Sequence, residues 1–234
     1  MARPTVILIH GAGCDHHAMA PLATALEARG VEARAIDLPG RNDAPGPPAT
    51  TAGEAAARIA GAIDARAIVL GHSYGSAVAM ELALATPIAG LVLASSGARL
   101  RVHPAILETM RAAEAAGPAS PPTAAWIEGA APREVVEAID RACRAVPSTT
   151  TRVDWEAVNA FDRLGALEAI AVPTLILTGA DDALTPPKYG RYLAEHIRGA
   201  ELALLDGVGH WCVVEAAERA ADRIALFARS RLAS

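Results

Sequence analysis

Several residue types are scarce in this 234-residue chain, and each scarcity excludes a class of protein. There are three cysteines, Cys14, Cys143 and Cys212, and they form neither a C-x-x-C pair nor a metal-ligand spacing. An odd number of cysteines without a disulfide framework suits a reducing cytoplasm. The apolar run Thr5–Ile9 is too short for a secretion signal, and no later run is long enough to span a bilayer. We therefore expect a cytoplasmic protein without membrane insertion.

Lysine is scarce as well. Lys188 is the only lysine, the arginines are scattered, and the formal net charge at pH 7 is -5. This balance argues against a protein that binds nucleic acid or an anionic membrane surface. The sequence also contains no H-E-x-x-H motif, no cysteine cluster and no P-loop, so we expect neither a metal nor an organic cofactor. The length fits a single domain over residues 1–234.

Short apolar runs alternate with longer, alanine-rich amphipathic stretches along most of the chain. Runs of Val, Ile and Leu without polar alternation are typical of strands that helices cover on both faces, as in a parallel sheet. The candidate strands are Thr5–Ile9, Val31–Ile36, Ala67–Leu70, Leu91–Ala94, Thr174–Leu177 and Leu202–Leu205. Helices are expected over Ser76–Ala85 and Val213–Ala228, and the capping box Thr51–Glu54 begins another. The pattern predicts an α/β fold with a mostly parallel, doubly wound sheet.

The alternation is interrupted once, between Gly97 and about Gly165. The expected helical segments are Pro104–Ala116, Thr123–Glu128, Arg133–Ala145 and Asp154–Leu164. We interpret residues 97–165 as a short helical cap inserted into the single domain, although a long crossover with extra helices has the same signature. Trp126, Trp155 and Phe161 lie in this insertion, where they would either wall an apolar pocket or pack against one another.

A nucleophile is indicated by the motif Gly71–Gly75, which follows a predicted strand and precedes a predicted helix. A serine on so sharp a turn has strained backbone angles, and only small residues fit two positions before and after it. The turn places the Ser73 hydroxyl at the carboxyl end of a strand and at the start of a helix, where backbone amides favour developing negative charge. We therefore predict Ser73 as the nucleophile.

A serine hydroxyl needs a base, and His210 follows the last predicted strand in a glycine-rich loop. The base needs an orienting carboxylate, and Asp181 and Asp182 follow the strand predicted over Thr174–Leu177. Taken singly, such residues are typical of surface turns and helix caps. All of them, however, follow strands, and the carboxyl ends of strands are where open α/β sheets bind ligands. The joint arrangement favours a catalytic serine, acid and histidine.

These motifs resemble the pattern of the α/β-hydrolase family, and the resemblance covers essentially the whole chain. The matching segments are His10–Gly13, Asp37–Gly40, Gly71–Gly75, Gly179–Pro186 and Gly207–His210. The antiparallel strands that the family usually has ahead of the His-Gly strand are missing. The resemblance therefore implies a trimmed, six-stranded version of the α/β-hydrolase fold.

The resemblance also implies roles for individual residues. It implies a catalytic triad of Ser73, Asp182 and His210, because the family motif G-x-x-D-x-x-x-P aligns with Asp182 rather than with Asp181. It further implies an oxyanion hole formed by the backbone amides of Ala12 and Tyr74.

The activity that follows is that of a serine carboxylic-ester hydrolase acting on a small or medium substrate through an acyl-enzyme on Ser73. A serine nucleophile argues against the dehalogenase and epoxide hydrolase chemistry of family members that use a carboxylate. Lactone opening, thioester hydrolysis, C–C hydrolysis and cyanohydrin cleavage stay open, because similar triads in this family catalyse each of them. A receptor that binds a small ligand with little turnover is a further alternative.

A dinucleotide-binding fingerprint is the strongest competitor outside the family. A predicted strand leads into Gly11-x-Gly13, and a second strand ends in Asp37. His16 occupies the third glycine position, where its side chain would crowd the helix against the sheet. That interpretation also leaves the predicted triad unexplained, so we favour the hydrolase.

Overall fold

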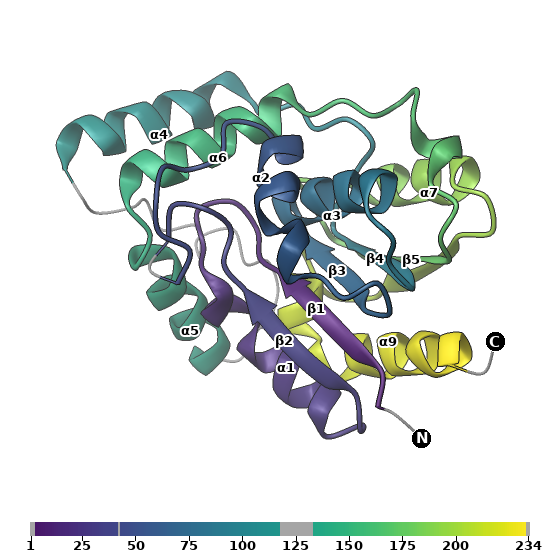
Figure 1. Ribbon diagram of the computed structural model, residues 1–234. Coiled ribbons are helices and arrows are strands. Elements are labelled where there is room, and N and C mark those ends of the chain that lie inside the picture. The colour runs from purple at the N-terminus through teal and green to yellow at the C-terminus, as the bar shows by residue number, and fades with distance from the viewer. Residues whose placement is uncertain (1–2, 42, 118–132, 233–234) are drawn as a thin grey trace.

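The computed structural model describes residues 3–41, 43–117 and 133–232. Its centre is a sheet of six parallel strands in the order β2-β1-β3-β4-β5-β6, with helices on both faces (Figure 1). The strands are β1 (Thr5–Ile9), β2 (Glu32–Ile36), β3 (Ile68–His72), β4 (Gly90–Ala94), β5 (Thr174–Gly179) and β6 (Glu201–Leu205). The predicted fold class is confirmed, and each predicted strand overlaps an observed one.

The central strands are the most apolar, as the sheet position requires. β3 and β4 are buried at every residue, whereas the edge strand β2 alternates between exposed and half-buried residues. Val69 in β3 pairs with Ile7 on one side and with Leu91 on the other, and its side chain is fully buried. β3 extends two residues beyond the predicted end, and this extension carries the chain to the turn at Ser73.

Helices cover both faces of the sheet (Figure 1). On one face lie α1 (Ala20–Glu27) and α9 (Ala217–Leu232), which pack against each other. On the other face lie α2 (Ala52–Ile59), α3 (Tyr74–Ala85) and α7 (Pro187–His196). The remaining short helices are η1 (His16–Met19), η2 (Ala60–Ala62), η4 (Leu167–Ala169) and α8 (Cys212–Glu215). Each face of the sheet thus has its own apolar core.

The start of α2 follows the predicted capping box with one difference. The backbone N–H of Glu54 donates to Thr51 Oγ1 over 3.1 Å, as expected. The Glu54 carboxylate accepts from the backbone N–H of Thr50 over 2.8 Å, one residue earlier than in the usual box. The first turn of this helix is therefore stabilised from both sides of Thr51.

Three α-helices lie between β4 and β5 in the described residues: α4 (Pro104–Ala116), α5 (Arg133–Arg144) and α6 (Ser148–Ala160). α4 matches the prediction at both ends, and α5 matches it within one residue. The prediction for α6 was wrong at both ends, because the helix begins six residues before Asp154 and ends four residues before Leu164. The segment expected over Thr123–Glu128, with Trp126, lies outside the described residues.

α4 and α6 pack against each other, and α5 packs against η1 (Figure 1). The Sγ atoms of Cys143 in α5 and Cys14 beside η1 lie 2.8 Å apart in a fully buried position. The segment between β4 and β5 is therefore in direct contact with the loop that follows β1.

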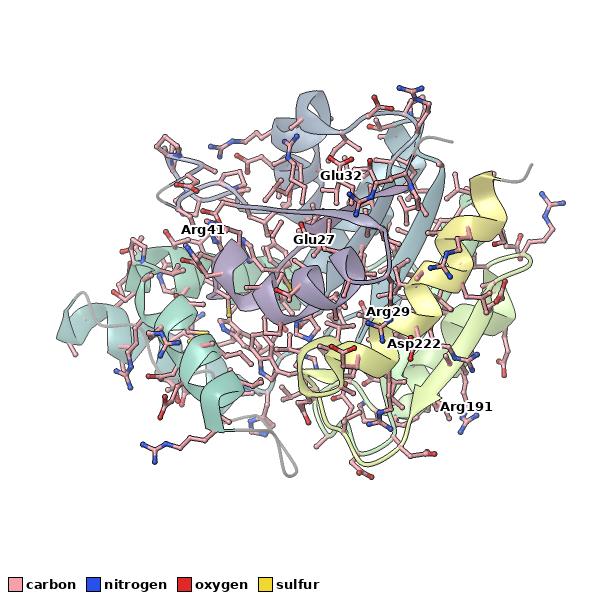
Figure 2. All side chains as sticks on the ribbon, turned by 90° about the horizontal axis from the view of Figure 1, so that it is seen from below. Glu27, Arg29, Glu32, Arg41, Arg191 and Asp222 are labelled. Carbon is pink, nitrogen blue, oxygen red and sulfur yellow. The ribbon has the colours of Figure 1, made fainter. Side chains whose placement is uncertain are left out.

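Surface ion pairs join helices that are distant in the sequence. Arg29 follows α1 and bonds Asp222 of α9 over 2.6 Å, on a solvent-exposed face (Figure 2). Figure 2 shows Arg41 on the other side of α1, next to the helices that lie between β4 and β5. Across residues 3–41, 43–117 and 133–232, no helix combines the length and the apolar character needed to cross a membrane.

Candidate active site

The turn from β3 to α3 contains a single residue, Ser73. Its φ of 53° and ψ of -116° are strained for a residue with a side chain. A Cβ on Gly71 would lie 2.1 Å from the carbonyl oxygen of Gly75, and a Cβ on Gly75 would lie 2.3 Å from the carbonyl oxygen of Ile9 in β1. Both positions therefore exclude any side chain, which is the physical reason for the two glycines of the motif.

The structure brings Ser73, His210 and Asp182 together at the carboxyl ends of β3, β5 and β6. His210 Nε2 lies 3.0 Å from Ser73 Oγ, and His210 Nδ1 lies 3.0 Å from Asp182 Oδ2. Asp182 is 3% exposed, whereas Asp181 points to solvent. An ionised Asp182 accepts a hydrogen bond from the Nδ1–H of His210. In this tautomer of His210, Nε2 carries no proton and can accept the hydroxyl proton of Ser73.

The Asp182 carboxylate is held by several donors. Thr185 donates to it through its backbone N–H over 2.8 Å and through its hydroxyl over 2.7 Å, and Leu184 donates its backbone N–H over 2.9 Å. Burial is the largest single influence and opposes ionisation, but the bonds from His210 and Thr185 together lower the pKa of Asp182 below its usual value. The carboxylate is therefore charged at neutral pH, as the orientation of His210 requires.

The loop that carries His210 is positioned by His72 and Glu215. Glu215 in α8 accepts the backbone N–H of Gly209 and of Trp211, each over 3.0 Å. His72 Nε2 lies 2.8 Å from the carbonyl oxygen of His210, to which it donates. Burial lowers the pKa of His72 to about 3, so this imidazole is neutral. No motif in the sequence indicated the role of Glu215.

The other side of Ser73 is formed by the loop after β1. The His10 Nδ1–H donates to the carbonyl oxygen of Gly11 over 2.8 Å, while His10 Nε2 accepts the backbone N–H of Leu38 over 3.1 Å. The Gly11 carbonyl and the Ala12 N–H belong to one planar trans peptide and point in opposite directions. His10 therefore fixes the direction of the Ala12 amide. Burial above all lowers the pKa of His10 well below its usual value, which keeps it neutral.

Tyr74 carries the second amide of the oxyanion hole that the family resemblance implies. It is the first residue of α3, where backbone amides have no acceptor within the helix. Ala12, Ser73 and His210 line one small cavity of about 10 Å³, which holds roughly one water molecule.

A larger cavity of about 200 Å³ also adjoins Ser73 and shares Trp155, Leu184 and His210 with the small one. Its apolar wall comes from the segment between β4 and β5 and from the loop after β5, through Leu100, Val102, Ile106, Trp155, Val158 and Leu184. Trp155 thus takes the position expected for a pocket wall, whereas Phe161 is buried in the core next to α6. Arg101 also lines this cavity, and both Arg99 and Arg101 lie near the carboxylate of Asp162.

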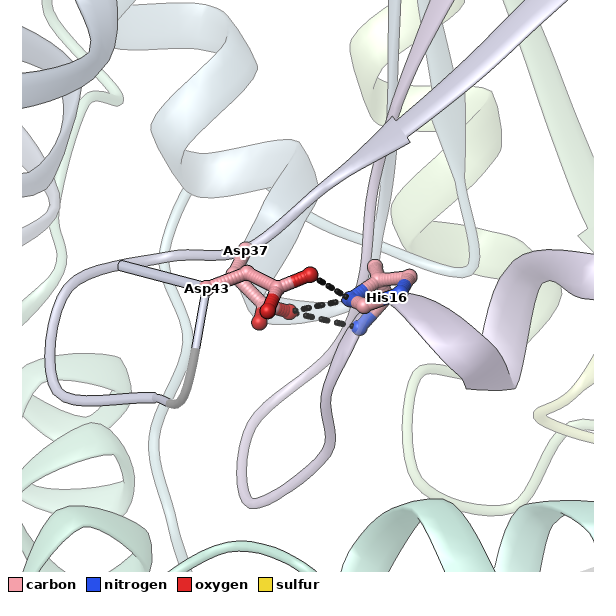
Figure 3. Close-up of side chains that lie close together, drawn as sticks. All are labelled: His16, Asp37 and Asp43. Carbon is pink, nitrogen blue, oxygen red and sulfur yellow. Dashed lines mark hydrogen bonds and ion pairs between the residues drawn. The ribbon is translucent and has the colours of Figure 1, made fainter. Parts of the chain in front are cut away.

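The described residues contain one grouping that could hold a metal ion, formed by His16, Asp37 and Asp43 (Figure 3). His16 Nδ1 lies 3.1 Å from Asp37 and 3.8 Å from Asp43, and Asp37 also accepts the backbone N–H of His16 over 2.7 Å. These three side chains line neither cavity beside Ser73. Asp37, the acid of the dinucleotide fingerprint, is 7% exposed and already bonded to His16.

The chain is similar to known hydrolases over most of its length. A model of the Alpha/beta hydrolase family matches residues 6–223. The pimeloyl-[acyl-carrier protein] methyl ester esterase of Neisseria meningitidis serogroup C is 32% identical over 220 residues, which are 88% of this chain and 86% of that protein. An esterase from Thermogutta terrifontis superposes with a TM-score of 0.81 at 23% identity, over 97% of this chain and 90% of its own. The chain belongs to the alpha/beta hydrolase family.

Proposed function

We propose that this protein hydrolyses a carboxylic ester of a small or medium substrate through an acyl-enzyme on Ser73. The observation that carries the proposal is the chain of contacts from Ser73 Oγ through His210 to Asp182, with both distances at 3.0 Å. The curated relatives include several named as esterases, which agrees with the predicted enzyme class, a carboxylic-ester hydrolase. The hydrogen-bonded contacts from Ser73 to Asp182 also argue against a receptor without turnover.

The proposed reaction begins when His210 Nε2 takes the Ser73 proton and Ser73 Oγ attacks the carbonyl carbon. The amides of Ala12 and Tyr74 donate to the tetrahedral oxyanion. The C–O bond to the alcohol then breaks, and the leaving oxygen takes the proton from His210. A water molecule repeats the sequence: it gives a proton to His210, attacks the acyl carbon and releases the acid from Ser73.

The two cavities support a substrate with one large and one small group. The apolar cavity of about 200 Å³ suits a medium-sized acyl or alcohol group, and the cavity of about 10 Å³ leaves room for about one water-sized group. The Neisseria relative is named as a methyl ester esterase, which agrees with a small leaving group. In this proposal α4 and α6 act as a cap over the larger cavity.

Intact-mass analysis after incubation with a fluorophosphonate tests the proposal, with Ser73→Ala as the control. One adduct on the wild type and none on the variant is the expected result. Methyl, ethyl and butyl esters of the same acid should then be cleaved in that order of kcat/KM, and lactones and thioesters should be slower. A folded wild-type protein that forms no adduct would contradict Ser73 as the nucleophile. If a lactone is opened faster than the esters are cleaved, the protein is a lactonase instead.

A further inference from the structure

A buried ion pair lies behind the loop that carries Ala12. Arg41 follows the Asp37–Gly40 turn, and Asp154 lies on α6 between β4 and β5. Their side chains form an ion pair in which 1% of Arg41 and 2% of Asp154 is exposed. Neither residue belongs to a motif that the sequence indicated, and neither lines a cavity beside Ser73. Removing two charges from water is costly, and hydrogen bonds to the surrounding groups must offset that cost.

Both charged groups bind the backbone of the loop after β1. Asp154 Oδ2 accepts the backbone N–H of Gly13 over 2.9 Å. Arg41 Nε donates to the carbonyl oxygen of Cys14 over 2.8 Å, and its Nη1 donates to that of Pro39 over 3.0 Å. The ion pair therefore joins α6 to two consecutive residues of the loop, through charge-assisted hydrogen bonds that are stronger than neutral ones.

These bonds fix the peptide group on the far side of Ala12. The peptide before Ala12 is held by His10, which donates to the Gly11 carbonyl over 2.8 Å. The peptide after Ala12 contains the Gly13 N–H, which Asp154 holds over 2.9 Å. With both adjoining peptide planes held, the backbone angles of Ala12 and the direction of its N–H are determined.

We propose that Arg41 and Asp154 are positioning residues, which act through the Gly11–Cys14 loop to aim the Ala12 amide at the oxyanion. This inference rests on the proposed function, because it assigns the Ala12 amide to the transition state. It also makes α6 part of the catalytic machinery: the helix that walls the larger cavity through Trp155 holds the oxyanion loop through Asp154.

The role predicts a loss in kcat with little change in KM, because the oxyanion exists in the transition state and not in the bound substrate. The double variant Arg41→Leu/Asp154→Leu removes both charges together and leaves no unpaired buried ion. Its kcat should fall about 10–100-fold, somewhat less than for removal of a donor itself, and its KM should stay within about twofold. Asp154→Asn keeps an oxygen that can accept from Gly13, so its kcat should fall by less than about tenfold.

Thr150→Val is the matched control. Thr150 lies on the same helix and donates to the carbonyl oxygen of Gly40 over 3.1 Å, so it also joins α6 to a neighbouring loop. Its loss should lower the melting temperature and leave kcat within about twofold. If the ion pair is merely structural, the double Leu variant should also have a lower melting temperature and a kcat within about twofold of the wild type. That result would overturn the proposal.

The Gly13 amide gives a readout that does not depend on activity. In protein labelled with ¹⁵N-glycine, the Gly13 proton should resonate downfield and exchange slowly, and it should move upfield in Asp154→Asn. An unmoved resonance would overturn the positioning role even if the Leu variant does not fold. If the wild type forms no fluorophosphonate adduct, the proposed function is contradicted. In that case the Gly13 resonance tests only whether Asp154 accepts the Gly13 N–H.

Discussion

The turn that carries Ser73 and the loop that carries Ala12 are held in place by different means. In the Ser73 turn, the strand end, the turn and the helix start are consecutive in sequence, and the crowding of Gly71 and Gly75 defines the turn. On the side of the oxyanion loop, the backbone is held by Asp154, which is 141 residues away from Gly13. The first arrangement can be read from a short motif, and the second depends on contacts between remote segments.

The largest effect is expected where the turn itself is changed. Gly71→Ala places a Cβ 2.1 Å from backbone atoms that cannot move without breaking α3 away from β3. We expect a loss of more than about 4 kcal/mol in the free energy of unfolding, or no folded protein. Gly61→Ala is the control, because a Cβ there meets nothing within 4 Å. Urea unfolding of the two variants compares them, and equal stability would mean that the turn can relax.

The carboxylate should come next in size. Asp182→Asn removes the charge that orients and stabilises a protonated His210, and we expect kcat to fall about a thousandfold or more. Asp181→Asn changes an exposed neighbour and should leave kcat within about twofold. Steady-state kinetics on one ester measures both. The reverse order of effects would assign the acid to Asp181.

A smaller effect is expected on the oxyanion side. Gly13 has a φ of +67°, and a Cβ there would lie 2.8 Å from Thr151 Cγ2 of α6. Gly30 has a similar φ of +76° with nothing within 4 Å, so Gly30→Ala measures the backbone strain alone, about 1 kcal/mol. Gly13→Ala should lose about 1–2 kcal/mol more in thermal unfolding, and kcat about tenfold, because it pushes the loop away from α6. Equal losses of stability for the two variants would show that Thr151 and α6 shift to make room for the added Cβ.

The last effect concerns acid rather than a substitution, and it builds up gradually as the pH falls. The folded pKa of His72 is lowered by burial from 6.5 to about 3, so the unfolded chain binds this proton more tightly. Stability is therefore complete above about pH 6.5 and falls as the pH drops towards 3, by up to about 1.4 kcal/mol per pH unit for this group. Urea unfolding between pH 7 and pH 4 measures the slope. His72→Gln keeps a donor for the His210 carbonyl, and its slope should be shallower by about one proton.

The central strands were predictable because each is a short apolar run, and such a run indicates burial on both faces of the sheet. α6 was not, because its first turn, Ser148–Thr151, consists of residues that disfavour helices. Burial of Ser148, Thr150 and Thr151 stabilises the turn nonetheless, and burial by remote segments leaves no local pattern. The predicted helix therefore began too late, at Asp154 instead of Ser148.

Within the candidate site, the motifs indicated the residues that the structure brings together, Ser73, Asp182 and His210. Each lies in a loop whose glycines or neighbouring strand are visible in the sequence. The residues that hold these loops, such as Glu215 and Arg41, gave no signal, because a single charged residue has many ordinary surface roles. Only their burial and their bonds to backbone groups distinguish them.

The contact between Asp154 and Gly13 has a consequence for recombining this protein with its relatives. A chimera that exchanges the whole segment between β4 and β5, as is natural when a new specificity is wanted, also removes the acceptor that holds the Gly13 amide. An exchange that includes α6 should therefore also include the loop after β1, so that Gly13 and its acceptor come from the same protein. Grafts that keep α6 of the host and replace α4 alone will change the pocket without disturbing the loop beside Ser73.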